Sequence, residues 1–98
     1  MKIFDRDPNV VAIARKRAGD HCEVPGCSYE PFAMASGDVY IEVHHIETLA
    51  SDGPDTPENV ACLCPVHHRE IHYGRRAEEL RVALRLRRLA GADATAAP

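Results

Sequence analysis

Residues 64–74, CPVHHREIHYG, decide the fold, because they combine the start and end of a helix with metal-binding side chains. Pro65 suits the first turn of a helix, where the N–H that it lacks has no intrahelical partner anyway, and Gly74 suits the position where the helix ends. His68 and His72 are four residues apart, so both side chains project from one face of this helix. We therefore expect the two imidazoles to chelate one ion.

A second set of ligands joins this helix to a distant part of the chain. Cys64 and His67 are separated by two residues, and Cys22 and Cys27 by four. Two close pairs of such ligands suit tetrahedral zinc, and a site with four protein ligands is structural rather than catalytic. Adjacent helical residues point in different directions, so one helix can serve two metals. The alternative is that these are buried thiols and a surface histidine without a metal.

The chain is short, with 98 residues, and contains no Trp, two Phe and three Tyr. A core of this size is thin, which favours a metal as an additional stabilising element. We predict a single domain over residues 1–98, with a motif core at 22–74 and flanking helices at about 8–19 and 75–89. On the first of these helices, Arg15, Lys16 and Arg17 are expected to form a solvated basic face.

The cysteines and the hydropathy of the sequence indicate in which cellular compartment the protein is found. The sequence shows neither a basic-then-apolar leader nor an apolar run of membrane length. In a reducing cytosol, cysteines that alternate with histidines bind metal more often than they bond to each other. We expect a cytoplasmic protein without membrane contact. The alternative is a secreted, disulfide-bonded fragment, which a reductant would unfold and a chelator would not.

Five of the six histidines fall in two short segments, 44–45 and 67–72. The β-branched and aromatic stretch 39–46 predicts a strand. Neighbouring strand residues point to opposite faces, so His44 and His45 reach one site only if the strand bends or ends there. The loop-like stretch at 51–58, which contains Gly, Pro and Asp, is compatible with such an end.

The segments YIEVHHI (40–46), PENV (57–60) and LCPVHHREIHYG (63–74) together resemble the HNH endonuclease family. The ββα-metal motif of that family pairs a hairpin that carries histidine with a helix that carries metal ligands. The resemblance extends from about Cys22 to Gly74, roughly half of the chain. It implies an α+β fold, a small ββα-metal (HNH, His-Me finger) domain with a structural zinc site, flanked by N- and C-terminal helices.

The resemblance also implies a role for each site residue. His44, His68 and His72 would bind one catalytic divalent metal, and His45 would be the general base. Asn59 would orient the hairpin that carries the base or approach the metal; taken alone, it would be a turn or cap residue. The implied function is a metal-dependent DNA endonuclease that hydrolyses phosphodiester bonds.

The chemistry of phosphodiester hydrolysis accounts for these residue types. An imidazole that titrates near neutral pH can deprotonate the attacking water. A divalent metal stabilises the negative charge that grows on the phosphate and on the leaving oxygen. An all-histidine ligand set favours Mn²⁺, Ni²⁺ or Zn²⁺, although the resemblance also allows Mg²⁺.

The formal net charge of −3 argues against nucleic-acid binding, but the charge is unevenly distributed. Residues 1–68 carry five basic and eleven acidic side chains (−6), and residues 69–98 carry seven arginines and four acids (+3). Arg69, Arg75 and Arg76 are candidate DNA phosphate contacts. The stripe of Arg81, Arg85 and Arg88 either extends this surface or is a solvated helix face.

The sequence shows no element that would read bases. We expect weak specificity, or specificity supplied by a protein partner or by a homodimer. The alternative function is a non-catalytic zinc module that binds nucleic acid or protein, which the negative net charge favours. That alternative predicts one bound metal per chain instead of two.

Overall fold

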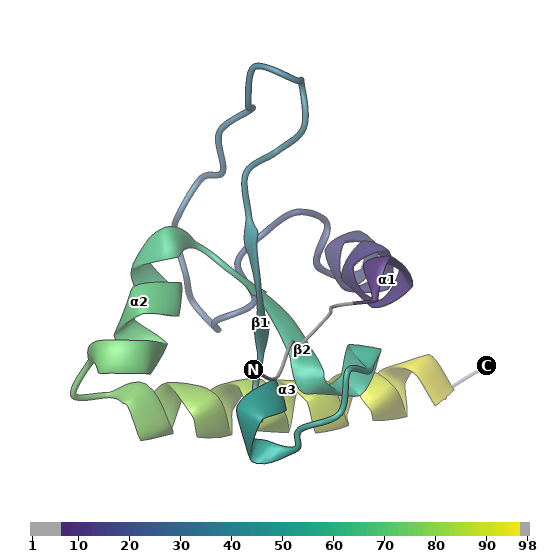
Figure 1. The fold of residues 1–98 in the computed structure, drawn as a ribbon, viewed down its shortest axis with the longest axis vertical. Coiled ribbons are helices and arrows are strands. Elements are labelled where there is room, and N and C mark those ends of the chain that lie inside the picture. The colour runs from purple at the N-terminus through teal and green to yellow at the C-terminus, as the bar shows by residue number, and fades with distance from the viewer. Residues whose placement is uncertain (1–6, 97–98) are drawn as a thin grey trace.

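Two short antiparallel strands, β1 (Glu42–His45) and β2 (Val60–Leu63), lie at the centre of the computed structural model, which describes residues 7–96 (Figure 1). Glu42 is opposite Leu63, and His45 is opposite Val60. All four residues of β2 are buried, whereas Glu42 on β1 is partly exposed. A strand that is buried on both faces requires cover on both sides, which helices provide.

Helix α1 (Pro8–Ala18) covers one face of the hairpin. The helix begins where the Asp7 side chain accepts a hydrogen bond from the amide of Asn9, and it ends at Gly19, which adopts a left-handed conformation with φ 61°. Val10 and Ala14 of α1 pack on Val60 and Cys62 of β2 in one hydrophobic cluster.

Helices α2 (Pro65–Tyr73) and α3 (Ala77–Ala96) cover the opposite face. Ala61 and Leu63, which alternate with the residues that face α1, pack with Ile71 of α2 and with Leu80 and Leu84 of α3. In Figure 1, α1 and α2 lie on opposite sides of the hairpin and α3 runs along its base. The predicted α+β fold, with two strands, a helix that carries ligands and flanking helices, is confirmed.

Some boundaries differ from those expected. The strand predicted at 39–46 is regular only over Glu42–His45, because residues 28–41 form a projecting loop whose only ladder contact is an isolated bridge between Ala33 and Val39. The second flanking helix begins at Ala77, two residues after the expected start, and continues to Ala96 instead of ending near residue 89. Two short 3₁₀ turns, Leu49–Ser51 and Pro57–Asn59, occupy the connection between the strands. No helix over residues 7–96 has the length and apolar character needed to cross a membrane.

A buried ion-pair network around Glu23 connects α1, β2 and α3. Glu23 is 2% exposed, and it pairs with Arg17 of α1 at 2.9 Å and with Arg88 of α3. The same carboxylate accepts a hydrogen bond from the amide of Cys62 on β2. Arg17 also donates to the carbonyl oxygens of Pro57 and Val60. Arg17 is therefore not on a solvated face, because its guanidinium turns inward to a carboxylate that lies only six residues further along the chain.

The Glu23 network yields a stability prediction. Glu23→Gln leaves Arg17 and Arg88 partly buried without a counter-charge, and we expect the free energy of unfolding to fall by on the order of 3 kcal/mol. The control is Glu78→Gln, which breaks the exposed Arg81–Glu78 pair and should cost less than about 1 kcal/mol. Urea denaturation of protein with a known zinc content measures both. Equal losses for the two variants would show that the buried network does not stabilise the fold.

Candidate active site and metal centres

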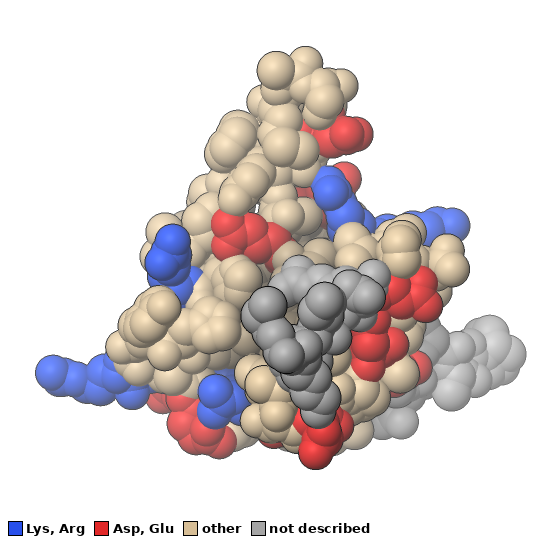
Figure 2. Space-filling view, in the orientation of Figure 1, with Lys and Arg blue, Asp and Glu red and all other residues tan. Residues whose placement is uncertain are grey.

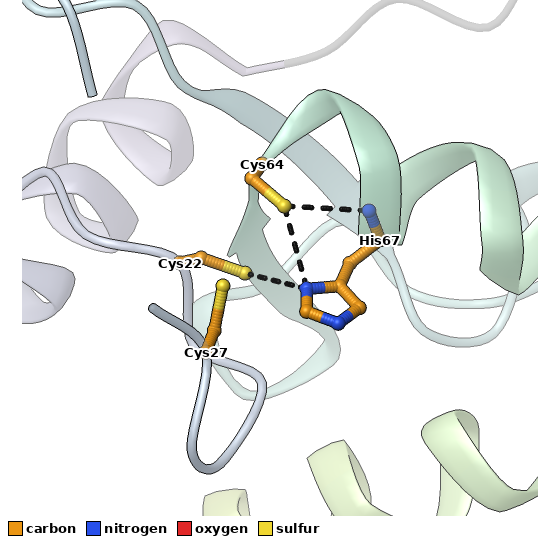
Figure 3. A group of neighbouring side chains, drawn as sticks. All are labelled: Cys22, Cys27, Cys64 and His67. Carbon is orange, nitrogen blue, oxygen red and sulfur yellow. Dashed lines mark hydrogen bonds between the residues drawn. The ribbon is translucent and has the colours of Figure 1, made fainter. Parts of the chain in front are cut away.

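The four residues predicted to bind structural zinc lie together, as Figure 3 shows. Cys22 and Cys27 come from the loop after α1, Cys64 follows β2, and His67 is in the first turn of α2. Their ligand atoms all lie within 4.8 Å of one another. His67 Nδ1 is 3.6 Å from the Sγ of Cys22 and 3.3 Å from the Sγ of Cys64. The Sγ of Cys64 also accepts a hydrogen bond from the amide of His67 and so caps α2.

The chemistry of these donors fits zinc. Three thiols and one imidazole form a four-ligand set of the kind that closes a structural site. These three cysteines, and Cys62 outside the cluster, are not in disulfides. Burial raises the pKa of the Cys22 thiol to about 12, so this thiol stays protonated unless a cation offsets the desolvation of its thiolate. A bound Zn²⁺ would supply that positive charge.

The second cluster consists of His44 from β1 and of His68 and His72 from α2. Their ring centroids lie 5.0 to 5.1 Å apart, and their ligand nitrogens lie within 4.8 Å of one another. His44 is 5% exposed, and its Nε2 atom is buried without a hydrogen-bond partner among the described residues. Buried polar atoms in proteins normally have a partner, and a metal ion would supply one here. The three imidazoles therefore fit a divalent cation.

The protonation of these histidines also suits metal binding. Burial, followed by the neighbouring His68 and His72, lowers the pKa of His44 to about 3. Burial, followed by His68, also lowers the pKa of His72. Both groups are thus neutral near neutral pH, which leaves a lone pair for a metal ion.

His45 lies beside this cluster because β1 ends at this residue. His44 and His45 both line a hollow of about 150 Å³. The two adjacent histidines therefore reach one site at the end of the strand, as the sequence required. The full lining comprises His44, His45, Thr48, Leu49, His68 and His72. His45 Nε2 lies 2.8 Å from Asp55 Oδ1. When Nε2–H donates to this carboxylate, the lone pair is on Nδ1.

Asn59 is 2% exposed and binds backbone on both sides of the loop between the strands. Its Oδ1 accepts a hydrogen bond from the amide of Glu47 at 3.0 Å. Its Nδ2 donates to the carbonyl oxygens of Glu47 at 2.9 Å and of Pro54 at 2.8 Å. Of the two roles that the resemblance allows, these contacts favour orientation of the hairpin over contact with a metal.

The predicted DNA contacts differ in their surroundings. Arg69, Arg75 and Arg76 are exposed, and Figure 2 shows basic side chains around the corner between α2 and α3. The Arg76 guanidinium binds both carboxylate oxygens of Glu70, at 2.9 and 3.0 Å. Phosphate binding by Arg76 would therefore compete with an internal ion pair, whereas no such pair occupies Arg69 or Arg75 among the described contacts.

The arginine stripe on α3 does not form one continuous binding surface. Arg88 is buried against Glu23, which excludes it from contact with a phosphate. Arg81 pairs with Glu78 at 2.5 Å, and Arg85 lies 3.8 Å from a carboxylate oxygen of Glu47. The regular spacing in the sequence therefore did not predict that the three arginines occupy different environments.

Sequence reasoning missed two acidic residues that contact the histidines. One is Asp55, the carboxylate partner of His45. The other is Glu42, whose Oε1 lies 2.7 Å from His68 Nδ1. The signal for Glu42 was its position two residues before His44, on the face of the strand that His44 also uses. Asp55 lies in an irregular loop, where no periodicity places a side chain.

Comparisons with known proteins agree with the fold. The sequence model of the family described as HNH endonuclease matches residues 25–74. The type IV methyl-directed restriction enzyme EcoKMcrA of Escherichia coli (strain K12) is 43% identical over 79 residues, 81% of this chain and 28% of that protein. The phosphorothioation-dependent restriction endonuclease ScoMcrA has a solved structure with a TM-score of 0.77 and 34% identity over 83% of this chain.

A third relative, the modification-dependent TagI restriction endonuclease, superimposes with a TM-score of 0.59 and 27% identity over 76% of this chain. The relatives are considerably longer than this chain. The match covers 28% of EcoKMcrA, 17% of the ScoMcrA chain and 30% of the TagI chain.

The zinc cluster yields a prediction with a matched control. Cys27→Ala removes one of four ligands, so we expect the variant to lose zinc and to unfold at a much lower urea concentration than the wild type. Cys62→Ala removes a buried thiol outside the cluster, and it should keep its zinc and lose on the order of 1 kcal/mol. Metal analysis and urea denaturation of both proteins provide the measurement. Equal zinc content in the two variants would contradict the assignment.

Proposed function

Because this chain belongs to the HNH endonuclease family, we propose that it is a metal-dependent DNA endonuclease that hydrolyses phosphodiester bonds. His45 is the general base, and His44, His68 and His72 hold one catalytic divalent metal. The observation that carries the proposal is the convergence of these three imidazoles on a hollow that His45 also lines.

In this proposal His45 takes a proton from the attacking water through Nδ1. Asp55 accepts the Nε2–H hydrogen bond, which holds the ring and stabilises the imidazolium that forms. Asn59 acts indirectly, because its three hydrogen bonds hold the backbone that follows His45 in place. A mispositioned base loses much of its effect, since proton transfer requires hydrogen-bond distance to the water.

The catalytic metal, when bound, stabilises the charge that develops on the phosphate and on the leaving 3′-oxygen. Neutral imidazole ligands leave the full charge of the cation available for this task. Mn²⁺, Ni²⁺, Zn²⁺ and Mg²⁺ are the candidates, and the nitrogen ligands favour the first three. Cys22, Cys27, Cys64 and His67 would hold a separate Zn²⁺, which would fix the start of α2, the helix that carries His68 and His72.

We propose that this chain cuts DNA without recognising the modification that triggers its relatives. Each of the three relatives is described as methyl-directed, phosphorothioation-dependent or modification-dependent, and each is more than three times the length of the matched part. The hollow beside the histidines is lined by the proposed metal ligands and base together with Thr48 and Leu49. Arg69, Arg75 and Arg76 are the proposed contacts to backbone phosphates, which carry no sequence information. A protein partner, a second copy of the chain or a further segment would then supply specificity.

Plasmid cleavage tests the catalytic assignment. With Mg²⁺, Mn²⁺, Ni²⁺ or Zn²⁺ added, the wild type should cut or nick plasmid DNA, and His45→Ala should be slower by about 10²- to 10⁴-fold. His21→Ala, which changes a histidine outside both clusters, should cut like the wild type. Methylated and unmethylated plasmids should be cut at the same rate.

Identical products from the wild type and His45→Ala would remove His45 from the proposal. A strong preference for methylated plasmid would instead show that recognition lies within this chain, without bearing on the identity of the base.

A further inference from the structure

The carboxylate of Glu42 bridges the first strand and the helix that carries the metal ligands. Its Oε1 lies 2.7 Å from His68 Nδ1, and its Oε2 accepts a hydrogen bond of 2.5 Å from the hydroxyl of Tyr40. We propose that Glu42 is a positioning residue for the catalytic metal, and that Tyr40 holds Glu42 in place. This inference rests on the proposed metal site of His44, His68 and His72.

The hydrogen bond determines which nitrogen of His68 faces the metal. A carboxylate that binds Nδ1 favours the tautomer with a proton on Nδ1, and this leaves the lone pair on Nε2. The same contact fixes the orientation of the ring and makes Nε2 a stronger donor. His68 is thereby prepared as a ligand before any metal arrives. The buried Nε2 of His44, which has no hydrogen-bond partner among the described residues, is the atom that would face the same ion.

The backbone positions Glu42 for this role. Glu42 is opposite Leu63 in the register of the hairpin, and Leu63 directly precedes the zinc ligand Cys64. The strand that carries Glu42 is thus held to the helix that carries His68 by its pairing with β2, because β2 leads through Cys64 directly into α2. The side chains of Glu42 and His68 are 27% and 21% exposed, so their contact is only partly open to competing water.

Tyr40 completes the chain of contacts at the base of the projecting loop. Its ring stacks on Phe32 with a centroid distance of 5.2 Å and an interplanar angle of 5°. The amide of Tyr40 also donates to the carbonyl oxygen of Phe32. Both oxygens of Glu42 are therefore bound, one by the ligand that it orients and one by a tyrosine that the loop holds in place.

Metal affinity, which does not depend on catalysis, tests the inference. Protein that carries one zinc per chain is titrated with Ni²⁺ by calorimetry, and zinc content is measured before and after. We expect Glu42→Ala to weaken Ni²⁺ binding about 10- to 100-fold, and Glu42→Gln and Tyr40→Phe to weaken it less. Glu30→Ala, which changes an exposed carboxylate in the projecting loop, should bind Ni²⁺ as the wild type does.

Cleavage at varied metal concentration provides a second readout. In Glu42→Ala the metal concentration for half-maximal cleavage should rise by the same factor as the dissociation constant, and saturating metal should restore most of the rate. A general loss of structure would lower the rate at every metal concentration. Circular dichroism shows whether each variant is folded, and Glu42→Gln, which keeps the shape of the side chain, replaces Glu42→Ala if that variant is not.

Each outcome separates this inference from the proposed function. Unchanged Ni²⁺ affinity in folded Glu42→Ala or Glu42→Gln overturns the role of Glu42 and leaves the nuclease proposal standing. Weakened affinity in a chain whose wild type cuts no DNA supports the role of Glu42 and contradicts the nuclease. A wild type that binds neither Ni²⁺ nor Mn²⁺, Mg²⁺ or a second Zn²⁺ overturns both.

Discussion

The position of one residue, Cys64, constrains the rest of the structure. Cys64 directly follows β2, its thiol belongs to the cysteine–histidine cluster that could hold zinc, and the same sulfur accepts the hydrogen bond that caps α2. The start and direction of α2 are therefore fixed at one point. Helix α2, which has nine residues, contributes to both clusters, because His67 belongs to the cysteine–histidine cluster and His68 to the histidine cluster. In a domain with so thin a core, a zinc ion on the cysteine–histidine cluster would replace packing that a larger protein obtains from apolar burial.

The two clusters were visible in the sequence because their ligands come in close pairs. Spacing along a helix places His68 and His72 on one face whatever surrounds them. Cys22 and Cys27 lie in a loop, and their short separation around Pro25 and Gly26 keeps the two thiols close. The residues that hold the site were not visible. Asp55 reaches His45 from an irregular loop, and Glu42 reaches His68 across 26 residues of chain. The spacing of Glu42 and His44 indicates which face of the strand Glu42 uses. Its contact with His68, however, depends on how distant elements pack, as does the contact of Asp55 with His45.

The arginines also show that a local sequence pattern does not predict which partner a side chain contacts. Arg17 and Arg88 lie in regular basic stretches that resemble solvated helix faces, yet both turn inward to Glu23. The network joins α1, the segment that carries Cys22, β2 and α3 through the single carboxylate of Glu23. A sequence-based count of free arginines therefore overstates the positive surface that is available to DNA. Of the arginines proposed as phosphate contacts, Arg69 and Arg75 best retain that role.

We propose that one chain holds two metals of different kinds, one structural and one catalytic. Native mass spectrometry of protein equilibrated with Zn²⁺ and Ni²⁺ counts bound ions directly. The account predicts two metals per wild-type chain and one in the folded His68→Ala/His72→Ala variant, because that variant loses two of three ligands of the histidine site and keeps the cysteine site intact. One metal in both proteins would contradict the account and favour a zinc module without catalysis.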